Sequence, residues 1–217
     1  MDYLLAAATT KEIAPFLSWI KSVPATDREI IPDILITGIG LTAATYHLTR
    51  QLGLKKYGLV IQAGVAGCFD TKIALGTVVA VKKETIADQS VIELKKLKTL
   101  FDLQLIPHDQ FPFKKGWLEN NNEALKKLKL KKVNAISVNE ITTSRQRVRF
   151  YEESFKPAIE SMEGAALHYT CLMEKIPFLQ LRSISNYIAE RDKTKWDMKR
   201  SIVNLNKELI HQIETIN

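Results

Sequence analysis

Three polar side chains stand where apolar segments that predict buried strands come to an end. Glu12 follows the apolar run at residues 2–8, Glu163 follows the short segment at 158–161, and Asn186 ends the run "FLQLRSISN". In α/β sheets ligands bind at the carboxyl ends of the strands, so we expect these side chains to face one crevice. Carboxylates in such a crevice can bind hydroxyl groups, stabilise a developing positive charge or take a proton from water.

Each of these side chains also has an ordinary structural explanation. Thr9 and Glu12 have the spacing of a capping box, in which Glu12 would bond the start of a helix. Glu163 precedes a run of small residues that opens a predicted helix, and a carboxylate is stabilising at that end. Arg182 lies inside the apolar strand that Asn186 ends, and an unpaired buried guanidinium is very costly. We expect Glu163 to be its partner, either in an ion pair that only fixes the fold or in a site.

Two glycine-rich segments, at residues 37–40 and 63–67, follow predicted strands. The second, "AGVAG", includes Ala63 and Gly64. Glycine lets the backbone approach a ligand closely and lets amides point toward it. Neither segment has the dinucleotide-binding fingerprint or a P-loop, and tight turns without a ligand would explain them equally well.

The sequence gives no sign of a metal, a cofactor or a membrane segment. The four histidines are scattered without the spacing of metal ligands, and the two cysteines, Cys68 and Cys171, suit a reducing compartment. No apolar run reaches the roughly 18–20 residues that span a bilayer. The N-terminus predicts a first strand, not a signal peptide. We therefore expect a cytoplasmic protein with no metal and no cofactor.

The net charge of +7 is concentrated in residues 82–132, which contain twelve lysines and seven acidic residues. A nucleic-acid face would be one interpretation of this segment. No arginine appears in it, however, and a solvated lysine-rich surface is the more economical interpretation. We therefore expect no nucleic-acid partner.

Predicted strands and helices alternate along the chain. The predicted strands lie at 2–8, 33–40, 75–83, 133–138, 158–164 and 178–185, and the stretch 58–67 is a further strand that runs into a glycine-rich loop. Three predicted helices lie at 41–53, 144–154 and 165–175. Two more begin at Thr9–Thr10 and at Lys195. Residues 84–116 show no clear pattern and predict a loop or an insertion near a site or a subunit interface. The alternation indicates one α/β domain over residues 1–217, with a mostly parallel, mixed central sheet flanked by helices.

The order "ATTKEI … TGIG … AGVAG … SMEGAA … RSISN" resembles the purine nucleoside phosphorylase and nucleosidase superfamily over nearly the whole chain. The most specific parts are residues 161–186 and their spacing to Glu12. Within that superfamily the chain is most similar to the futalosine hydrolases, nucleosidases of an alternative menaquinone pathway. The resemblance implies the three-layer nucleoside phosphorylase fold, a small nucleoside substrate and a homodimer or larger homo-oligomer.

The resemblance also implies roles for single positions. Glu12 would orient and activate the attacking water, Met162 and Glu163 would hold the ribose, and Asn186 would contact the purine near N7 and the six-position. The other substrate-binding positions that it implies are Ala63, Gly64, Ile141, Arg182 and Trp196.

The residue at position 186 bears on the base. Adenine-releasing nucleosidases of the superfamily have an aspartic acid there, whereas the neutral amide of Asn186 offers a donor and an acceptor. That suits a 6-oxopurine, so we expect hypoxanthine to be released. A methylthioadenosine/S-adenosylhomocysteine nucleosidase, a purine nucleoside phosphorylase and a binding module without catalysis are the alternatives.

The remaining predictions concern the nucleophile and the substrate tail. No Arg or Lys lies in the two glycine-rich segments, and Asp70 would repel phosphate, so water is the expected nucleophile. A futalosine-type substrate carries a benzoate carboxylate, which an arginine can bind through two hydrogen bonds. The candidates are Arg145, Arg147, Arg149 and Arg191. The first three could instead face solvent from one helix.

Overall fold

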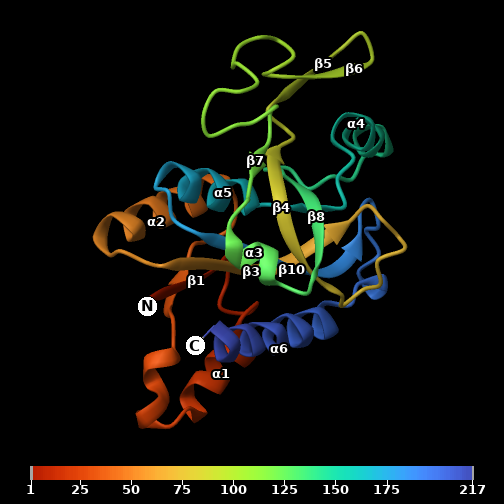
Figure 1. The fold of residues 1–217 in the computed structure, drawn as a ribbon. Coiled ribbons are helices and arrows are strands. Elements are labelled where there is room, and N and C mark those ends of the chain that lie inside the picture. Colours follow the sequence, from red (N-terminus) through yellow and green to blue (C-terminus); the bar gives the residue numbers. More distant parts are fainter. Residues whose placement is uncertain (1, 217) are drawn as a thin grey trace.

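In the computed structural model, which describes residues 2–216, the apolar runs of the sequence form the strands of one mixed sheet (Figure 1). β1 (Tyr3–Ala7) is buried along its whole length, as expected for a strand covered on both faces. β2 (Asp33–Ile36) and β3 (Leu59–Cys68) pair with β1 in parallel, one on each side. β1 therefore lies inside the sheet, and its carboxyl end leads directly to Glu12.

Five strands close into a ring. They are β3, β4 (Val78–Ile86), β8 (Lys131–Ser137), β9 (Ile159–Ser161) and β10 (Phe178–Tyr187). β10 pairs with both β3 and β4, β8 pairs with β4 and β9, and β9 returns to β3. The short β7 (Leu118–Glu119) adds to β4. Closure brings β9 and β10, the strands that lead to Glu163 and Asn186, to either side of β3.

Helices cover both faces of the sheet. They are α1 (Ala14–Ser22), α2 (Leu41–Leu54), α5 (Gly164–Met173) and α6 (Met198–Ile216). α1 packs on α6 and α2 packs on α5, and Figure 1 shows the two pairs on opposite sides of the strands. Leu5 and Ala7 of β1 join the core under α1 and α6, while Leu4 and Ala6 join the core under α2 and α5. The alternation of side chains along one strand thus builds both cores.

The smaller elements complete the chain. They are α3 (Glu123–Lys127), α4 (Arg145–Phe155) and 3-10 helices at Ala25–Ile30 and Lys193–Lys195. No helix in the described part of the chain is long and apolar enough to cross a bilayer.

The segment at 84–116 contains more structure than the sequence predicts. It includes the hairpin β5 (Ser90–Glu93) and β6 (Lys96–Thr99), which projects from the body of the protein (Figure 1). Its turn residues, Leu94 and Lys95, both have positive φ, and the Leu94 side chain is 94% exposed. Turns of this kind usually carry Asn or Gly, so the pattern that would have predicted the hairpin is missing.

The second glycine-rich segment, at 63–67, is a strand and not the predicted loop. It forms the carboxyl half of β3, which pairs with β10 as far as Cys68 and with β9 at Gly67. Pairing with β10 therefore runs along the whole segment, and the glycines serve close packing across the strand instead of a turn.

Two helix starts also differ from the prediction. The first helix begins at Ala14, after a turn that contains Glu12, and Pro15 lies in its first turn, where a missing N–H costs nothing. The last helix begins at Met198, because Lys193–Lys195 forms a separate 3-10 turn. Both differences leave short irregular segments beside the carboxyl ends of β1 and β10.

Candidate active site

A cavity of about 390 Å³ opens at the carboxyl ends of β1, β3, β9 and β10. Residues singled out in the sequence line it, namely Glu12, Ile141, Met162, Glu163, Asn186 and Trp196, together with Thr9 and the tail candidate Arg191. Its volume lies within the range of small-molecule sites. The predicted crevice therefore exists, and it gathers the three polar side chains on which the prediction rested.

Glu12 is held by hydrogen bonds to both carboxylate oxygens. Oε1 accepts from the backbone N–H of Val65 on β3, at 3.1 Å. Oε2 accepts from the Thr9 amide at 3.1 Å and from its hydroxyl at 3.2 Å. The Thr9–Glu12 contact that a capping box would make is therefore present, but it closes a turn and caps no helix. The side chain amide of Asn206 on α6 donates to the Glu12 carbonyl at 2.8 Å and steadies that turn.

Glu163 lies at the start of α5 and is 6% exposed. Its Oε1 accepts from the backbone N–H of Gly40 at 3.0 Å, so the first glycine-rich segment supplies an amide to the site. Its Oε2 lies 3.6 Å from Nη2 of Arg182, which confirms the predicted ion pair. The closer hydrogen bond of Nη2 goes to Oε1 of Gln62, at 2.8 Å, a partner that the sequence did not predict.

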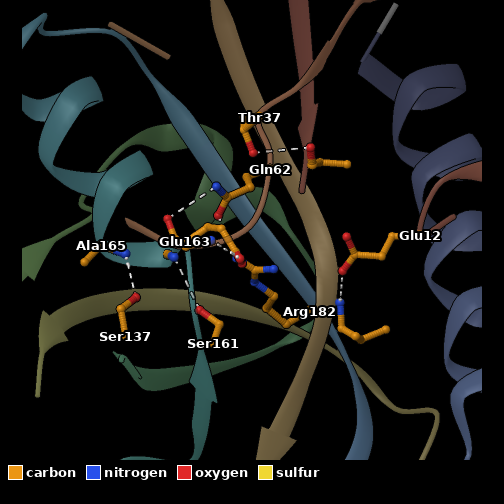
Figure 2. Close-up of polar contacts among 12 residues, drawn as sticks. Glu12, Thr37, Gln62, Ser137, Ser161, Glu163, Ala165 and Arg182 are labelled. Atoms are coloured by element: carbon orange, nitrogen blue, oxygen red, sulfur yellow. Dashed lines mark hydrogen bonds and ion pairs between the residues drawn. The ribbon is translucent and has the colours of Figure 1, made fainter. Parts of the chain in front are cut away.

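Arg182 is 1% exposed, and Figure 2 shows its side chain between those of Glu163 and Glu12. Gly64 makes this position possible. A Cβ at Gly64 would stand 2.2 Å from Nη1 of Arg182 and 2.9 Å from Oε1 of Glu12. Any side chain at Gly64 would therefore displace the guanidinium or the carboxylate. Ala63, Gly64 and Arg182 support the site from behind and do not line the cavity in the described residues.

Asn186 lies within β10 and not beyond its end. The register between β10 and β3 shifts between Ile184 and Asn186, and such a bulge re-aims the side chains next to it. The Ser185 hydroxyl lies 2.8 Å from Oδ1 of Asn186, and Nδ2 donates to the Tyr187 carbonyl at 3.2 Å. Nδ2 therefore keeps one N–H for a ligand.

The apolar wall of the cavity includes Ile141, which is 50% exposed, and Met162. Trp196 follows the 3-10 turn before α6, and its Nε1 donates to the Glu190 carbonyl at 3.0 Å. The Arg191 guanidinium lies 5.7 Å from the centre of the Trp196 ring, and Arg191 also lines the cavity.

The arginines of α4 are placed elsewhere. Neither Arg145 nor Arg147 lines the cavity in the described residues. Nη1 of Arg147 donates to the Tyr151 hydroxyl at 3.2 Å within the same helix. Of the four arginines considered for a substrate tail, Arg191 is the one at the mouth of the cavity.

A second group of polar residues is buried behind the first helical turn of α5. We call Glu84, Ser137, His168 and Gln180 the sealed cluster; within the described part of the chain, none of them lines the cavity. The Ser137 hydroxyl accepts from the Ala165 amide at 2.8 Å and donates to Oε1 of Glu84 at 3.1 Å. Figure 2 shows Ser137 and Ser161 under the start of α5. The cluster thus fixes the helix end that carries Glu163.

Burial dominates the titration of the sealed cluster. It raises the pKa of Glu84 to about 7, against the opposing effects of Gln180 and of the Arg182 charge. It lowers the pKa of His168 to about 4, although Nδ1 contacts the Leu118 carbonyl at 2.9 Å. A closed interior disfavours charge, so it favours the uncharged forms of both the imidazole and the carboxyl group.

Sequence reasoning missed Gln62 and Glu84 as supports of the site. Gln62 shares one signal with Arg182, namely a polar residue inside an apolar strand, and that signal can be read from the sequence. Glu84 follows two lysines and gives no such signal. For the glycine-rich segment at 37–40 amides were expected, but nothing in the sequence selects the Gly40 amide, because backbone groups are the same at every position. Among the described residues, no group of three or more His, Cys, Asp and Glu side chains could hold a metal ion.

Comparisons with known proteins show the family of the chain. The sequence model of one protein family, the phosphorylase superfamily, matches residues 33–213 of the chain. The futalosine hydrolase of Thermus thermophilus is 26% identical over 171 residues, which are 77% of this chain and 75% of that protein. The 5'-methylthioadenosine/S-adenosylhomocysteine nucleosidase of Maridesulfovibrio salexigens is 25% identical over 170 residues, 72% of this chain and 68% of that protein.

The fold also matches solved structures. The native structure of Helicobacter pylori futalosine hydrolase has a TM-score of 0.78 at 20% identity, over 99% of this chain and 98% of that chain. The α/β fold predicted from the sequence is confirmed.

Proposed function

Because the chain belongs to the phosphorylase superfamily, as its sequence motifs predict, we propose that it is a nucleosidase that hydrolyses the N-glycosidic bond of a 6-oxopurine nucleoside. Futalosine is the proposed substrate, and hypoxanthine and dehypoxanthine futalosine are the proposed products, in menaquinone biosynthesis. One observation supports this most strongly. Two carboxylates, the half-buried Glu12 and the buried Glu163, are fixed by backbone amides and line one cavity together with Asn186.

The chemistry follows from where these charges lie. Cleavage of an N-glycosidic bond passes through an oxocarbenium-like transition state with positive charge on the sugar. Carboxylates that are already fixed in place stabilise that charge more than they stabilise the neutral substrate. In the proposed mechanism Glu163 binds the ribose hydroxyls. Glu12 accepts a proton from the attacking water, a role that contributes on the order of 10²–10⁴ in rate.

The leaving base needs a hydrogen-bond donor as its electron density rises. In our proposal the free N–H of Asn186 Nδ2 donates to N7 or O6 of the purine, with Ser185 holding Oδ1 in place. Met162 and Ile141 pack on the sugar and base, and Trp196 covers the site.

Water is proposed as the nucleophile because the cavity offers little to hold phosphate. The glycine-rich segments contribute no Arg or Lys. Arg182 is buried against Gln62 and Glu163. The two cations that line the cavity, Lys11 and Arg191, are both exposed.

We also propose a homo-oligomer in which a second copy covers the mouth of the cavity. Ile39, Ile141 and Met198 line the cavity and remain 62%, 50% and 39% exposed. Light scattering of the purified protein tests this part of the proposal, and a monomer at all concentrations would contradict it.

The substrate is tested by incubating the protein with futalosine, inosine and methylthioadenosine, each with and without phosphate, and identifying the released base by chromatography. The proposal predicts release of hypoxanthine from futalosine at a rate that phosphate does not change. Release of adenine from methylthioadenosine alone would instead indicate a 5'-methylthioadenosine/S-adenosylhomocysteine nucleosidase. Release that requires phosphate would identify a phosphorylase.

A further inference from the structure

The buried guanidinium of Arg182 has three carboxylates around it. Arg182 is the one Lys or Arg side chain that is buried in the described part of the chain. Glu163 lies 3.6 Å from it, and Glu12 approaches it across the space that a side chain at Gly64 would fill (Figure 2). The third carboxylate is Glu84, which interacts electrostatically with Arg182 from within the sealed cluster. One positive charge therefore meets three groups that can be negative.

Glu84 lies against the first residue of α5, which follows Glu163 in the chain. Its side chain is fully buried on β4 and is outside the cavity lining. A Cβ at Gly164 would clash with Oε2 of Glu84 and with Nε2 of Gln180. The Ser137 hydroxyl, which accepts from an amide of the same helical turn, donates to Oε1 of Glu84 at 3.1 Å. Two separate contacts therefore hold Glu84 against the turn of helix that carries Glu163.

The other neighbours of Glu84 carry no charge. Ser137 of β8 and Gln180 of β10 are neutral hydrogen-bond partners. His168 of α5 lies beyond Gln180, and burial lowers its pKa to about 4, so it is neutral near pH 7. β7 pairs with β4 through its backbone, and α6 packs on β4 around Ala80, among apolar side chains. The charges that face Glu84 are therefore those of the guanidinium and its carboxylate partner at the start of α5.

Charge balance in this interior favours a proton on Glu84. Three carboxylates against one guanidinium would leave excess negative charge away from water, which is very costly. The proton goes to the carboxyl group with the least access to water, and Glu84 is the fully buried one. Burial raises its pKa to about 7, against the opposing effects of Gln180 and of the Arg182 charge. Glu84 therefore gains its negative charge as the pH rises through neutrality.

We propose that Glu84 is a positioning residue that controls, through Arg182, how strongly the negative charge of Glu163 acts on the sugar. This proposal rests on the proposed function and adds a source of pH dependence to it. Protonated Glu84 leaves the guanidinium charge uncompensated beside Glu163, where it opposes positive charge on the sugar. Ionised Glu84 compensates the guanidinium. Because the sugar is neutral in the substrate and positive in the transition state, this ionisation should raise kcat and leave KM nearly unchanged.

The parent protein tests the proposal between pH 6 and pH 8, with futalosine as the substrate. We expect kcat to rise about 3- to 30-fold across this range, the order of magnitude for unit charges that interact at an effective dielectric constant of about 20. KM should change less than about twofold, because the charge of Glu84 acts on the transition state and not on the neutral sugar. A kcat that stays level or falls between pH 6 and pH 8 would overturn the proposal.

Two matched variants separate Glu84 from other titrating groups. Glu84→Gln fixes an uncharged side chain of nearly the same shape, so its kcat should lack the rise. Glu140→Gln makes the same chemical change at an exposed residue outside the cavity lining and should keep the parent's rise. Glu160, a cavity-lining residue whose pKa burial also raises, is present in all three proteins and contributes equally to them. The same rise in Glu84→Gln and in the parent would contradict the role of Glu84.

Gln180→Met provides a test that does not depend on the folding of Glu84→Gln. The Gln180 amide lowers the pKa of Glu84, and a Met side chain removes that donor. The midpoint of the rise in kcat should therefore move to higher pH. A midpoint at the same pH in Gln180→Met and in the parent would contradict the proposal.

Failure of this proposal is distinguishable from failure of the proposed function. If the protein hydrolyses futalosine but kcat depends on pH in the same way in the parent, Glu84→Gln and Gln180→Met, the function stands and the role of Glu84 is wrong. If it hydrolyses no 6-oxopurine nucleoside at either pH, both are wrong.

Discussion

The acidic side chains that line the cavity and the acidic side chain inside the sealed cluster differ in what surrounds them. Glu12 and Glu163 face the cavity and are held by the backbone amides of Val65 and Gly40. Glu84 is enclosed by the sealed cluster, and burial raises its pKa to about 7. The same functional group thus lines a cavity in one place and supports the interior in the other. What separates the two is access to the cavity and the number of fixed donors, not the residue type.

The largest expected effect is on catalysis by Glu163→Gln. The amide keeps an acceptor for the Gly40 N–H but loses the charge that stabilises the sugar. We expect kcat to fall on the order of 10²–10³. The free energy of unfolding should fall as well, because Arg182 keeps its hydrogen bond to Gln62 but loses its charged partner. Steady-state assays and denaturant unfolding of the same preparation check both halves. A destabilised variant that keeps the parent's kcat would instead place Glu163 with the supports.

Next in size is the pH dependence of stability that the sealed cluster creates. Glu84 binds a proton in the folded state between its ordinary pKa of 4.5 and about 7. Its contribution to the free energy of unfolding therefore falls as the pH rises through that range, by about 1.4 kcal/mol per pH unit at most. His168, with its pKa lowered from 6.5 to about 4, contributes the opposite slope between those values.

Glu84→Gln should expose the slope of His168. The parent should show a weak dependence between pH 4.5 and 6.5, because the two contributions oppose each other. The variant should gain stability with rising pH over the same range. Guanidinium unfolding of parent and variant at several pH values measures the difference, and Glu140→Gln provides an exposed control. If the free energy of unfolding changed with pH in the same way in the parent and in Glu84→Gln, the pKa of Glu84 would not be raised in the folded protein.

A smaller effect is expected from crowding the boundary between the two groups with Gly164→Ala. The new Cβ would stand 2.3 Å from Oε2 of Glu84 and 2.4 Å from Nε2 of Gln180. Overpacking of this kind costs about 1–3 kcal/mol. Gly53→Ala in α2 has nothing within 4 Å of its Cβ and should instead be neutral or stabilising. The measurement is the change in Tm of each variant relative to the parent. Equal changes in the two variants would contradict the tight packing at Gly164.

The smallest effect lies at the exposed rim. Arg191→Met should raise KM for futalosine about two- to fivefold, the range of an exposed ion pair, and leave KM for inosine unchanged. Arg147→Met, on α4 outside the cavity lining, is the matched control. If Arg147→Met alone raised KM for futalosine, the tail would bind along α4 and not at the mouth.

The sequence predicts the cavity-facing group better than its supports. Glu12, Glu163 and Asn186 follow or end apolar runs, and the rule that ligands bind at strand ends connects them without knowledge of strand order. The sealed cluster depends on closure of the ring, which brings Glu84 of β4 beside Gln180 of β10, almost a hundred residues away. Such pairing over long separations leaves no local pattern.

The same lack of a local sequence pattern explains where the predicted strands and turns differ from the observed ones. Residues 63–67 look like a loop because glycine weakens a strand, yet pairing with β10, and with β9 at Gly67, keeps them in β3. The bulge that aims Asn186 and the hairpin turn at Leu94 and Lys95 have no distinctive residues to predict them.

The most direct test of the account compares hypoxanthine release from futalosine by the parent protein and by Glu12→Gln in phosphate-free buffer. The account predicts sustained release by the parent, unchanged when phosphate is added, and a loss on the order of 10²–10⁴ in the variant while its fold is kept. Equal rates for the two proteins, or release only after phosphate is added, would contradict a site in which Glu12 activates water.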